Sequence, residues 1–313
     1  MNKLCMSVLA LFISFTNFTA TAHITYSTQR TQTMAPKEFD LKIPNENRKI
    51  HTRLTLPENT KTKLPQLVII ATGLYSQMDK PSQLKKAKSF QQAGFATLQF
   101  NFMAHGNNKN KSDGNIKDVT LSSGITDLKS VWDYAKQNLS KKINTNDIVI
   151  AANSYGALVS LIALEQNLIS PESMVLTAPF SLDEVKPWVL PIRLFAKIMP
   201  NTTAKLFKVS PAMLIDFLKY HTKAMNNKQL LGNTAVYFFV GSKDNISSAS
   251  AIQKWCKDFN AQQPANVKFV NNIQAHYKIY DNVQHFTIPD AVNDDICKCS
   301  IDFLKQTHTM KSK

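Results

Sequence analysis

The chain has 313 residues, which is long enough for one large α/β domain. It carries 37 Lys and Arg residues against 22 Asp and Glu residues, giving a net charge of +15. The basic residues are spread along the chain, without an RNA-binding signature or a basic helix interleaved with aromatic residues, so we exclude nucleic acid as a partner. We interpret the charge as a solvated Lys-rich surface, and weak attraction to anionic surfaces stays open.

The N-terminal segment is typical of a secretory signal peptide. It has a positive start at 1–3, an apolar core at 8–13 and small residues of the A-x-A type at 20–22. We therefore expect residues 1–22 to be removed and the mature protein to be secreted or periplasmic; an uncleaved anchor is the alternative. Residues 23–35 are polar and predict a loose leader. No later segment is long and apolar enough to cross a bilayer.

Three cysteines remain after this segment: Cys256, Cys297 and Cys299. An exported chain can form disulfides, but an odd number leaves at least one thiol unpaired, and the residues alone do not decide the pairing. His and Cys residues are too few at ligand spacing to indicate a structural zinc site. We expect no cofactor and no metal, and the oligomeric state is open.

The hydrophobic periodicity predicts strands that alternate with helices. In chain order these are a hairpin of strands 37–43 and 50–56, strand 67–71, helix 81–93, strand 95–100, a helix containing 125–135, strand 148–152, helix 157–165, strands 174–178 and 235–240, helix 249–259, strand 277–280 and helix 291–304. This alternation predicts an α/β domain over 36–313 with a mainly parallel sheet and helices on both faces. Ligands of such sheets bind at the carboxyl ends of the strands.

Residues 180–232 break the alternation with four prolines and short amphipathic pieces. We predict a helical cap over the strand ends, because its apolar residues need a surface to cover. Its large apolar side chains either line a pocket for an apolar acyl or aromatic group or form ordinary core between cap and body, and they are Trp188, Phe195, Met199, Phe207, Met213 and Phe217.

The stretch IVIAANSYGALV passes abruptly from a β-branched run to a helix rich in Ala and Leu. Ser154 lies at this change, with small residues Ala152 and Gly156 two positions to either side. A serine on such a strand-to-helix turn is raised above the sheet with its hydroxyl exposed. The pattern predicts that Ser154 is a nucleophile.

Two later loops supply the acid and base that such a serine needs. Asp244 follows strand 235–240 and His285 follows strand 277–280, so the chain order is Ser, Asp, His. We predict that His285 takes the proton of Ser154 and that Asp244 orients the imidazole. Alternative residues of the same types are Asp216, Asp281, His221 and His276.

An acyl-transfer site also needs N–H donors for the developing oxyanion. The predicted donors are the backbone N–H groups of Tyr155, directly after the serine, and of Leu74, in the loop after strand 67–71. Gly73 would let this loop turn toward the substrate.

Three stretches resemble one known family. They are the loop TGLYSQMDK at 72–80, the stretch GFATLQFNFMAHGN at 94–107 with its continuation through Asp127, and the serine turn with the later Asp and His loops. The chain resembles α/β-hydrolases of the cinnamoyl/feruloyl esterase and serine aminopeptidase-like (dienelactone hydrolase-like) group, over about 64–179 and 234–304. The resemblance implies an α/β-hydrolase fold and hydrolysis of a small-molecule ester, and a structural role for His105 in its loop.

The chain departs from the family pattern at Thr72, Asn101, Ala152 and Asn153, where the family usually has His, Asp, Gly and His. These departures leave the substrate open. A peptidase (with Asp216 or Glu184 binding a free amino group), a thioesterase, a lipase and a non-catalytic surface-binding protein are the alternatives to an esterase.

Overall fold

The computed structural model describes residues 36–58, 64–179, 194, 198, 210, 212–213, 216, 219–220, 234–261 and 275–311. The predicted signal peptide, leader and most of the predicted cap lie outside these residues. Of the six predicted pocket residues only Met213 is described, and it is fully buried. No helix in the described part of the chain is long and apolar enough to cross a membrane. Cys256, Cys297 and Cys299 carry free thiols.

The centre of the molecule is one eight-stranded sheet with the order β1-β2-β4-β3-β5-β6-β7-β8. The first two strands run antiparallel to their neighbours and the other six are parallel, which confirms the predicted fold class. The strands are β1 (Lys37–Asn45), β2 (Arg48–Leu56), β3 (Gln66–Ala71), β4 (Ala96–Phe100), β5 (Asn144–Asn153), β6 (Ser173–Thr177), β7 (Ala235–Gly241) and β8 (Ala275–Tyr280).

The hairpin of β1 and β2 forms as predicted, with a tighter turn. Pro44 and Asn45 belong to the strand pair, and Glu46 adopts a φ of 52° in the turn. Because β1 is an edge strand, Pro44 can lie in it without breaking the interior hydrogen bonding of the sheet.

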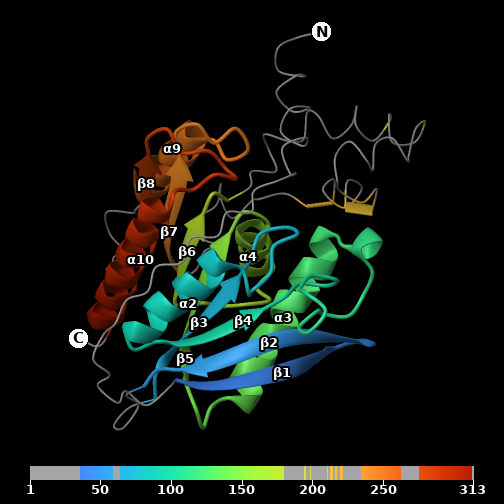
Figure 1. Cartoon of the computed structure of the whole chain (residues 1–313). Coiled ribbons are helices and arrows are strands. Elements are labelled where there is room, and N and C mark those ends of the chain that lie inside the picture. Colours follow the sequence, from blue (N-terminus) through green and yellow to red (C-terminus); the bar gives the residue numbers. More distant parts are fainter. Residues whose placement is uncertain are drawn as a thin grey trace, which may run out of the picture.

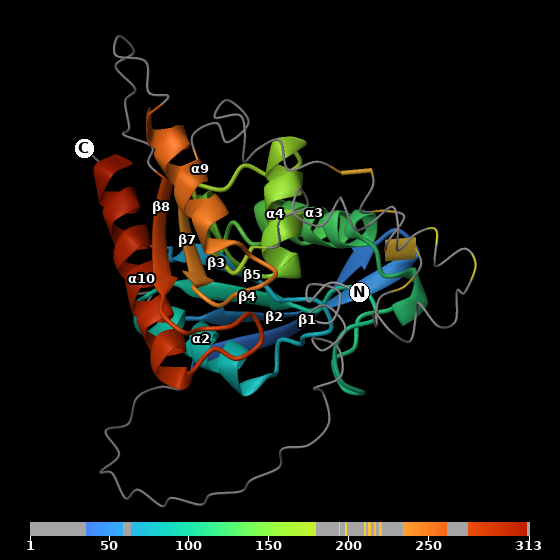
Figure 2. The same ribbon diagram turned by 90° about the horizontal axis from the view of Figure 1, so that it is seen from above.

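Helices cover both faces of the sheet, as Figures 1 and 2 show. The helices α3, α4 and α9 pack on one face, and α2 and α10 pack on the other. The helices are α2 (Pro81–Gln92), α3 (Leu121–Asn138), α4 (Tyr155–Glu165), α9 (Ala249–Ala261) and α10 (Asp290–Lys311), with a short 3-10 helix, η1 (Ile116–Asp118), before α3.

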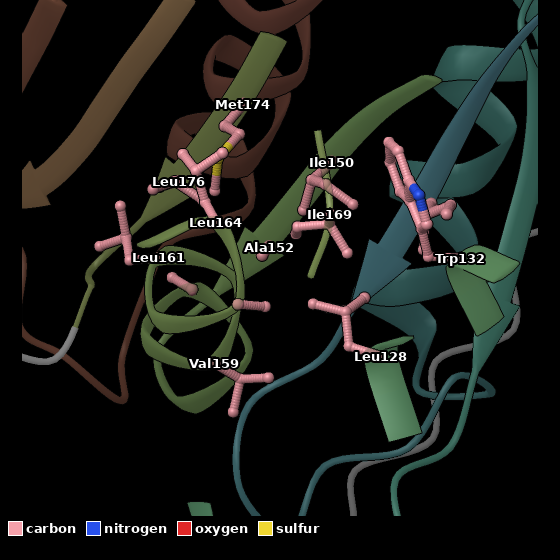
Figure 3. Close-up of a cluster of buried hydrophobic side chains, with 14 of the residues drawn as sticks. Leu128, Trp132, Ile150, Ala152, Val159, Leu161, Leu164, Ile169, Met174 and Leu176 are labelled. Atoms are coloured by element: carbon pink, nitrogen blue, oxygen red, sulfur yellow. The ribbon is translucent and has the colours of Figure 1, made fainter. Parts of the chain in front are cut away.

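Strand β3 shows why both faces are covered. Leu67 and Ile69 pack against the α3 and α4 side, whereas Val68 and Ile70 pack against the α2 and α10 side, and all four are fully buried. Alternate residues of a strand point to opposite faces, so a continuous apolar run needs a helix layer on each. Figure 3 shows the larger cluster around α4, which includes Trp132, Ile150, Val159 and Leu176 among others.

Helix α4 approaches β3 so closely that its second residue must be glycine. A Cβ on Gly156 would lie 2.5 Å from the carbonyl oxygen of Thr72 and 2.6 Å from that of Ala71. Both are backbone atoms of the segment that leaves β3, so they cannot move aside as a flexible side chain would.

We therefore expect Gly156→Ala to lower the free energy of unfolding by about 3 kcal/mol, because the added methyl group overpacks the helix against the backbone. Gly94→Ala is the control, since Gly94 has a φ of 94° and a Cβ at this position would meet no atom within 4 Å. It should cost about 1 kcal/mol from backbone strain alone. Urea unfolding of both variants measures the difference, and equal losses would contradict the close approach.

Candidate functional site

Ser154 lies on a sharp turn at the carboxyl end of β5. Its backbone has φ 51° and ψ −118°, values that residues with a side chain adopt rarely and at a cost of roughly 1–3 kcal/mol. Neighbouring backbone fixes this geometry, because the N–H of Ser154 donates to the carbonyl of Thr177 at 2.9 Å and its own carbonyl accepts the N–H of Leu158 at 3.1 Å. Strain that is held in this way is a common feature of functional sites.

The turn brings Ser154 to His285, which follows β8, although 131 positions separate them in the chain. The Oγ atom of Ser154 lies 2.8 Å from Nε2 of His285. On the other side of the ring, Nδ1 of His285 lies 2.9 Å from Oδ2 and 3.1 Å from Oδ1 of Asp244. The carboxyl ends of β5, β7 and β8 thus bring together the three residues that the sequence singles out.

Asp244 is held rigidly behind the histidine. Its Oδ1 atom also accepts the backbone N–H groups of Ile246 at 2.9 Å and Ser247 at 2.8 Å. The side chains of Asp244 and His285 are 1% and 3% exposed, so solvent does not screen their interaction. The carboxylate therefore fixes the orientation of the ring, with Nε2 directed at Ser154.

The alternative residues have other surroundings. Asp216 accepts both the backbone N–H and the hydroxyl of Ser122, at 2.6 and 2.9 Å, and thereby caps the start of α3. Asp281 is exposed in the turn after β8, and His276 is exposed on that strand. His221 lies outside the described residues.

The predicted oxyanion donors lie on two segments that meet at the serine. Tyr155 is the first residue of α4, so its N–H has no acceptor within the helix. A Cβ on Gly73 would lie 3.4 Å from Cβ of Ser154, which places the loop carrying Leu74 directly against the turn. In the described part of the chain we find no acceptor for the N–H of Leu74.

His105 positions this loop. Its Nε2 accepts the backbone N–H of Tyr75 at 2.7 Å, and its Nδ1 donates to the carbonyl of Met103 at 2.7 Å. The N–H of Tyr75, next to that of Leu74, is therefore already paired. The two bonds together fix the tautomer of the ring, with the proton on Nδ1. Burial lowers the pKa of His105, so the neutral ring that can accept this bond is favoured.

A buried carboxylate fixes the backbone that holds His105, and sequence reasoning matched this residue to the family but gave it no role. Asp127, on α3, accepts the backbone N–H of Met103 at 2.7 Å, the Arg48 guanidinium at 3.0 Å and the Asn45 amide at 2.6 Å. Burial raises the pKa of Asp127, and the adjacent Arg48 opposes that rise. The sequence did carry a signal for this role, because Asp127 lies among the apolar residues that recur at helical spacing and form the buried face of α3.

Tyr155 is fixed through its side chain as well. Its buried hydroxyl donates to the carbonyl of Thr120 at 2.6 Å, directly before α3. Burial, with the nearby charges of Asp127 and Asp216, raises the pKa of Tyr155 well above its ordinary value, so the hydroxyl stays a donor. A Cβ on Gly124 would lie 2.2 Å from this hydroxyl, which explains the glycine inside α3.

Two departures from the family pattern leave polar atoms without partners. Oγ1 of Thr72 and Oδ1 of Asn153 are buried and have no hydrogen-bond partner within the described residues. Thr72 directly precedes Gly73, and Asn153 directly precedes Ser154. The surroundings of the site therefore differ from the family pattern at these two positions. Asn101 has a structural role, since its side chain accepts the N–H of Met78 and donates to the carbonyl of Asn110.

Solved structures with the same arrangement of strands and helices include esterases. Est1E from Butyrivibrio proteoclasticus, solved with ferulic acid bound, superposes with a TM-score of 0.63 over 86% of this chain and 99% of its own, at 17% identity. The esterase Pf2001 from Pyrococcus furiosus superposes with a TM-score of 0.62 over 90% and 95%, at 19% identity. This chain has the α/β-hydrolase fold. Alpha/beta hydrolase domain-containing protein 10 from mouse is similar too, with a TM-score of 0.61 over 86% of this chain and 98% of its own, at 13% identity.

Sequence comparison relates the first half of this α/β-hydrolase fold to acyl transferases. A family model described as acyl transferase matches residues 37–176. The acyl transferase of Photorhabdus luminescens is 31% identical over 125 residues, which are 40% of this chain and 38% of that protein. The acyl transferase of Photobacterium leiognathi is 29% identical over 132 residues, 42% of this chain and 38% of its own. The matched segment thus spans less than half the length of these relatives.

The role of His105 predicts a pH dependence of stability. Its folded pKa lies below its unfolded value of about 6.5, so the unfolded chain binds the proton more readily and stability falls as pH drops below about 6.5. His105→Gln keeps an acceptor for the N–H of Tyr75 but cannot titrate. Urea unfolding at pH 7 and pH 5 should show a smaller loss in this variant than in the unaltered protein.

The pKa values of His51, which is buried, and of His276, whose ring packs against Tyr237 and Phe303, are also lowered by desolvation. Both histidines contribute equally to the two proteins and cancel in this comparison. The same loss in the two proteins would contradict a neutral His105 in the loop.

Proposed function

We propose that this protein is an exported serine hydrolase that cleaves carboxylic esters through an acyl-enzyme intermediate on Ser154. The observation that carries the proposal is the continuous hydrogen-bonded line from Oγ of Ser154 through the ring of His285 to the carboxylate of Asp244. The fold alone hosts many reactions, so the argument rests on these three side chains.

In the first half-reaction, Oγ of Ser154 attacks the ester carbonyl carbon while Nε2 of His285 takes the hydroxyl proton. The oxyanion that forms accepts hydrogen bonds from the N–H groups of Leu74 and Tyr155; each such donor contributes about 10²–10³-fold to the rate in related chemistry. The C–O bond to the leaving alcohol then breaks, and His285 returns the proton to that oxygen. The acyl group is now an ester of Ser154.

In the second half-reaction, water attacks this ester and His285 takes its proton. Collapse of the second oxyanion releases the carboxylic acid, and the proton on His285 returns to Oγ of Ser154. Asp244 stabilises the imidazolium that exists between these transfers. Apart from the ester and water, these reaction steps require only the side chains and backbone N–H groups named above.

A second candidate is transfer of the acyl group to an acceptor other than water. The match of residues 37–176 to an acyl transferase family and the names of the related proteins favour it. Both candidates share the first half-reaction and the same acyl-enzyme. They differ in the nucleophile that attacks the acyl-enzyme in the second half-reaction. Analysis of the products formed with added alcohol or thiol acceptors therefore separates hydrolysis from acyl transfer.

A fluorophosphonate probe should label the protein, because an activated serine hydroxyl displaces its leaving group. Ser154→Ala should lose the labelling and about 10⁴–10⁶-fold of the turnover of p-nitrophenyl esters. Ser89→Ala, on α2 away from the turn, is the control and should behave as the unaltered protein. Absent labelling would refute the proposal and leave a non-catalytic binding protein. Labelling that survives in Ser154→Ala would refute it as well, because the activated nucleophile would then be another residue.

The same preparation identifies the substrate class. Rates are compared for p-nitrophenyl esters of graded chain length, acyl thioesters and aminoacyl anilides. An esterase prefers the first group, a thioesterase the second and a peptidase the third, and a rise with chain length indicates a lipase-like preference.

A further inference from the structure

A second cluster of polar side chains lies at the opposite end of the sheet from Ser154. Asp147 is near the start of β5, Glu172 directly precedes β6, and His308 is in the last turns of α10. Ser154 lies seven positions after Asp147, which is roughly 23 Å along the strand at 3.3 Å per residue. Figure 1 shows the C-terminal end of α10 at the end of the sheet where the parallel strands begin.

The spacing within this cluster is too long for hydrogen bonds but close to that of shared metal ligands. Nδ1 of His308 lies 3.9 Å from Oδ2 of Asp147 and 4.0 Å from Oε2 of Glu172, and all three ligand atoms lie within 4.8 Å of one another. A direct N–H···O bond would need about 2.7–3.2 Å. Ligands at 2.0–2.2 Å from one cation lie about 3–3.5 Å apart. The two carboxylate oxygens would therefore have to move about 1 Å or less toward Nδ1 of His308 to complete its side of the site.

Neighbouring amides orient both carboxylates. Nδ2 of Asn144 donates to Oδ2 of Asp147 at 2.7 Å, and Nε2 of Gln66 donates to Oε2 of Glu172 at 2.6 Å. A carboxylate oxygen has two lone-pair directions, so each can accept the amide and still bind a cation. Such donors around the ligands are characteristic of metal sites.

The backbone of this region is fixed and the site is open on one side. The N–H of Asn144 donates to the carbonyl of Pro65, and the N–H of Glu172 donates to that of Ile148, both at 2.9 Å. The side chain of Glu172 is 3% exposed, whereas those of Asp147 and His308 are 29% and 33% exposed. One ligand is therefore anchored in the protein and two face an entry path from solvent.

We propose that Asp147, Glu172 and His308 bind one divalent transition-metal cation, of which Zn²⁺ is the best match. One imidazole nitrogen and two carboxylate oxygens suit Zn²⁺, whereas Mg²⁺ and Ca²⁺ prefer oxygen ligands alone. The cation joins the C-terminal helix to the start of β5 and to the residue before β6, so its role is structural. Solvent would complete the coordination on the exposed side.

The test uses the mature full-length chain with no affinity tag, stripped with EDTA and dialysed. Isothermal titration with ZnCl₂ should give one saturable equivalent per chain, and Zn²⁺ should raise the unfolding temperature by several degrees. His308→Ala should weaken binding by about 100-fold and abolish that rise. Asn144→Ala, which removes an orienting amide, should weaken it by about 10-fold.

His276→Ala is the matched control, because His276 is an exposed histidine on β8 that belongs to no such cluster within the described residues. It should bind Zn²⁺ as the unaltered protein does. Co²⁺ substitution adds an optical readout, since thiolate ligands from Cys297 or Cys299 would give a sulfur charge-transfer band that this site lacks.

Absence of saturable binding would overturn the proposal and leave His308 as a polar neighbour of the two carboxylates. Unchanged binding in His308→Ala, or a sulfur band with Co²⁺, would overturn it as well. Fluorophosphonate labelling of Ser154 is independent of all these results.

Discussion

The turn between β5 and α4 is the constraint on which the rest of the structure depends. Ser154 adopts a left-handed φ of 51°, and this conformation persists only because the strand before it and the helix after it are both fixed by packing. Helix α4 meets the backbone after β3 within contact distance, which Gly156 alone permits. The same contact brings the loop of Gly73 against the serine. One packing arrangement thus places the predicted nucleophile and the predicted oxyanion loop together.

Hydrogen bonds among buried polar groups fix the loop next to the serine, which packing alone does not hold. Asp127 holds the backbone of Met103, the carbonyl of Met103 holds the ring of His105, and His105 holds the N–H of Tyr75. Each group has its partner, so the loop is held without burying an unpaired charge. Tyr155 is fixed in a similar way from α3. The donors on both sides of the serine are therefore oriented by hydrogen bonds that belong to the protein itself.

The sequence predicts the elements that carry strong local patterns. The buried run at β3, the hairpin of β1 and β2 and the strand-to-helix change at Ser154 follow from periodicity and small residues, and the structure has them. The order of Ser154, Asp244 and His285 sufficed to nominate three residues that the folded chain brings within hydrogen-bonding distance. Local signals succeed here because each residue lies within five positions of the end of a strand.

Other features depend on contacts that no local pattern encodes. Asp127 pairs with Arg48, 79 positions away, and His308 meets carboxylates from two strands only after α10 has packed on the sheet. Strand β5 begins at Asn144, four residues before the apolar run, because Asn144 pairs with Gln66 of β3. The predicted cap at 180–232 and its aromatic residues stay a prediction, as do the signal peptide and the export of the chain.

The most direct test of the account is the mass of the protein during turnover. The chain is mixed with p-nitrophenyl butyrate, quenched with acid within the first turnover and measured by intact-mass and peptide-mapping spectrometry. We predict a gain of one butyryl group, located on the peptide that contains Ser154, and no gain in Ser154→Ala. Release of p-nitrophenol with the acyl group on another residue, or with no acylated protein at any time, would contradict an acyl-enzyme on Ser154.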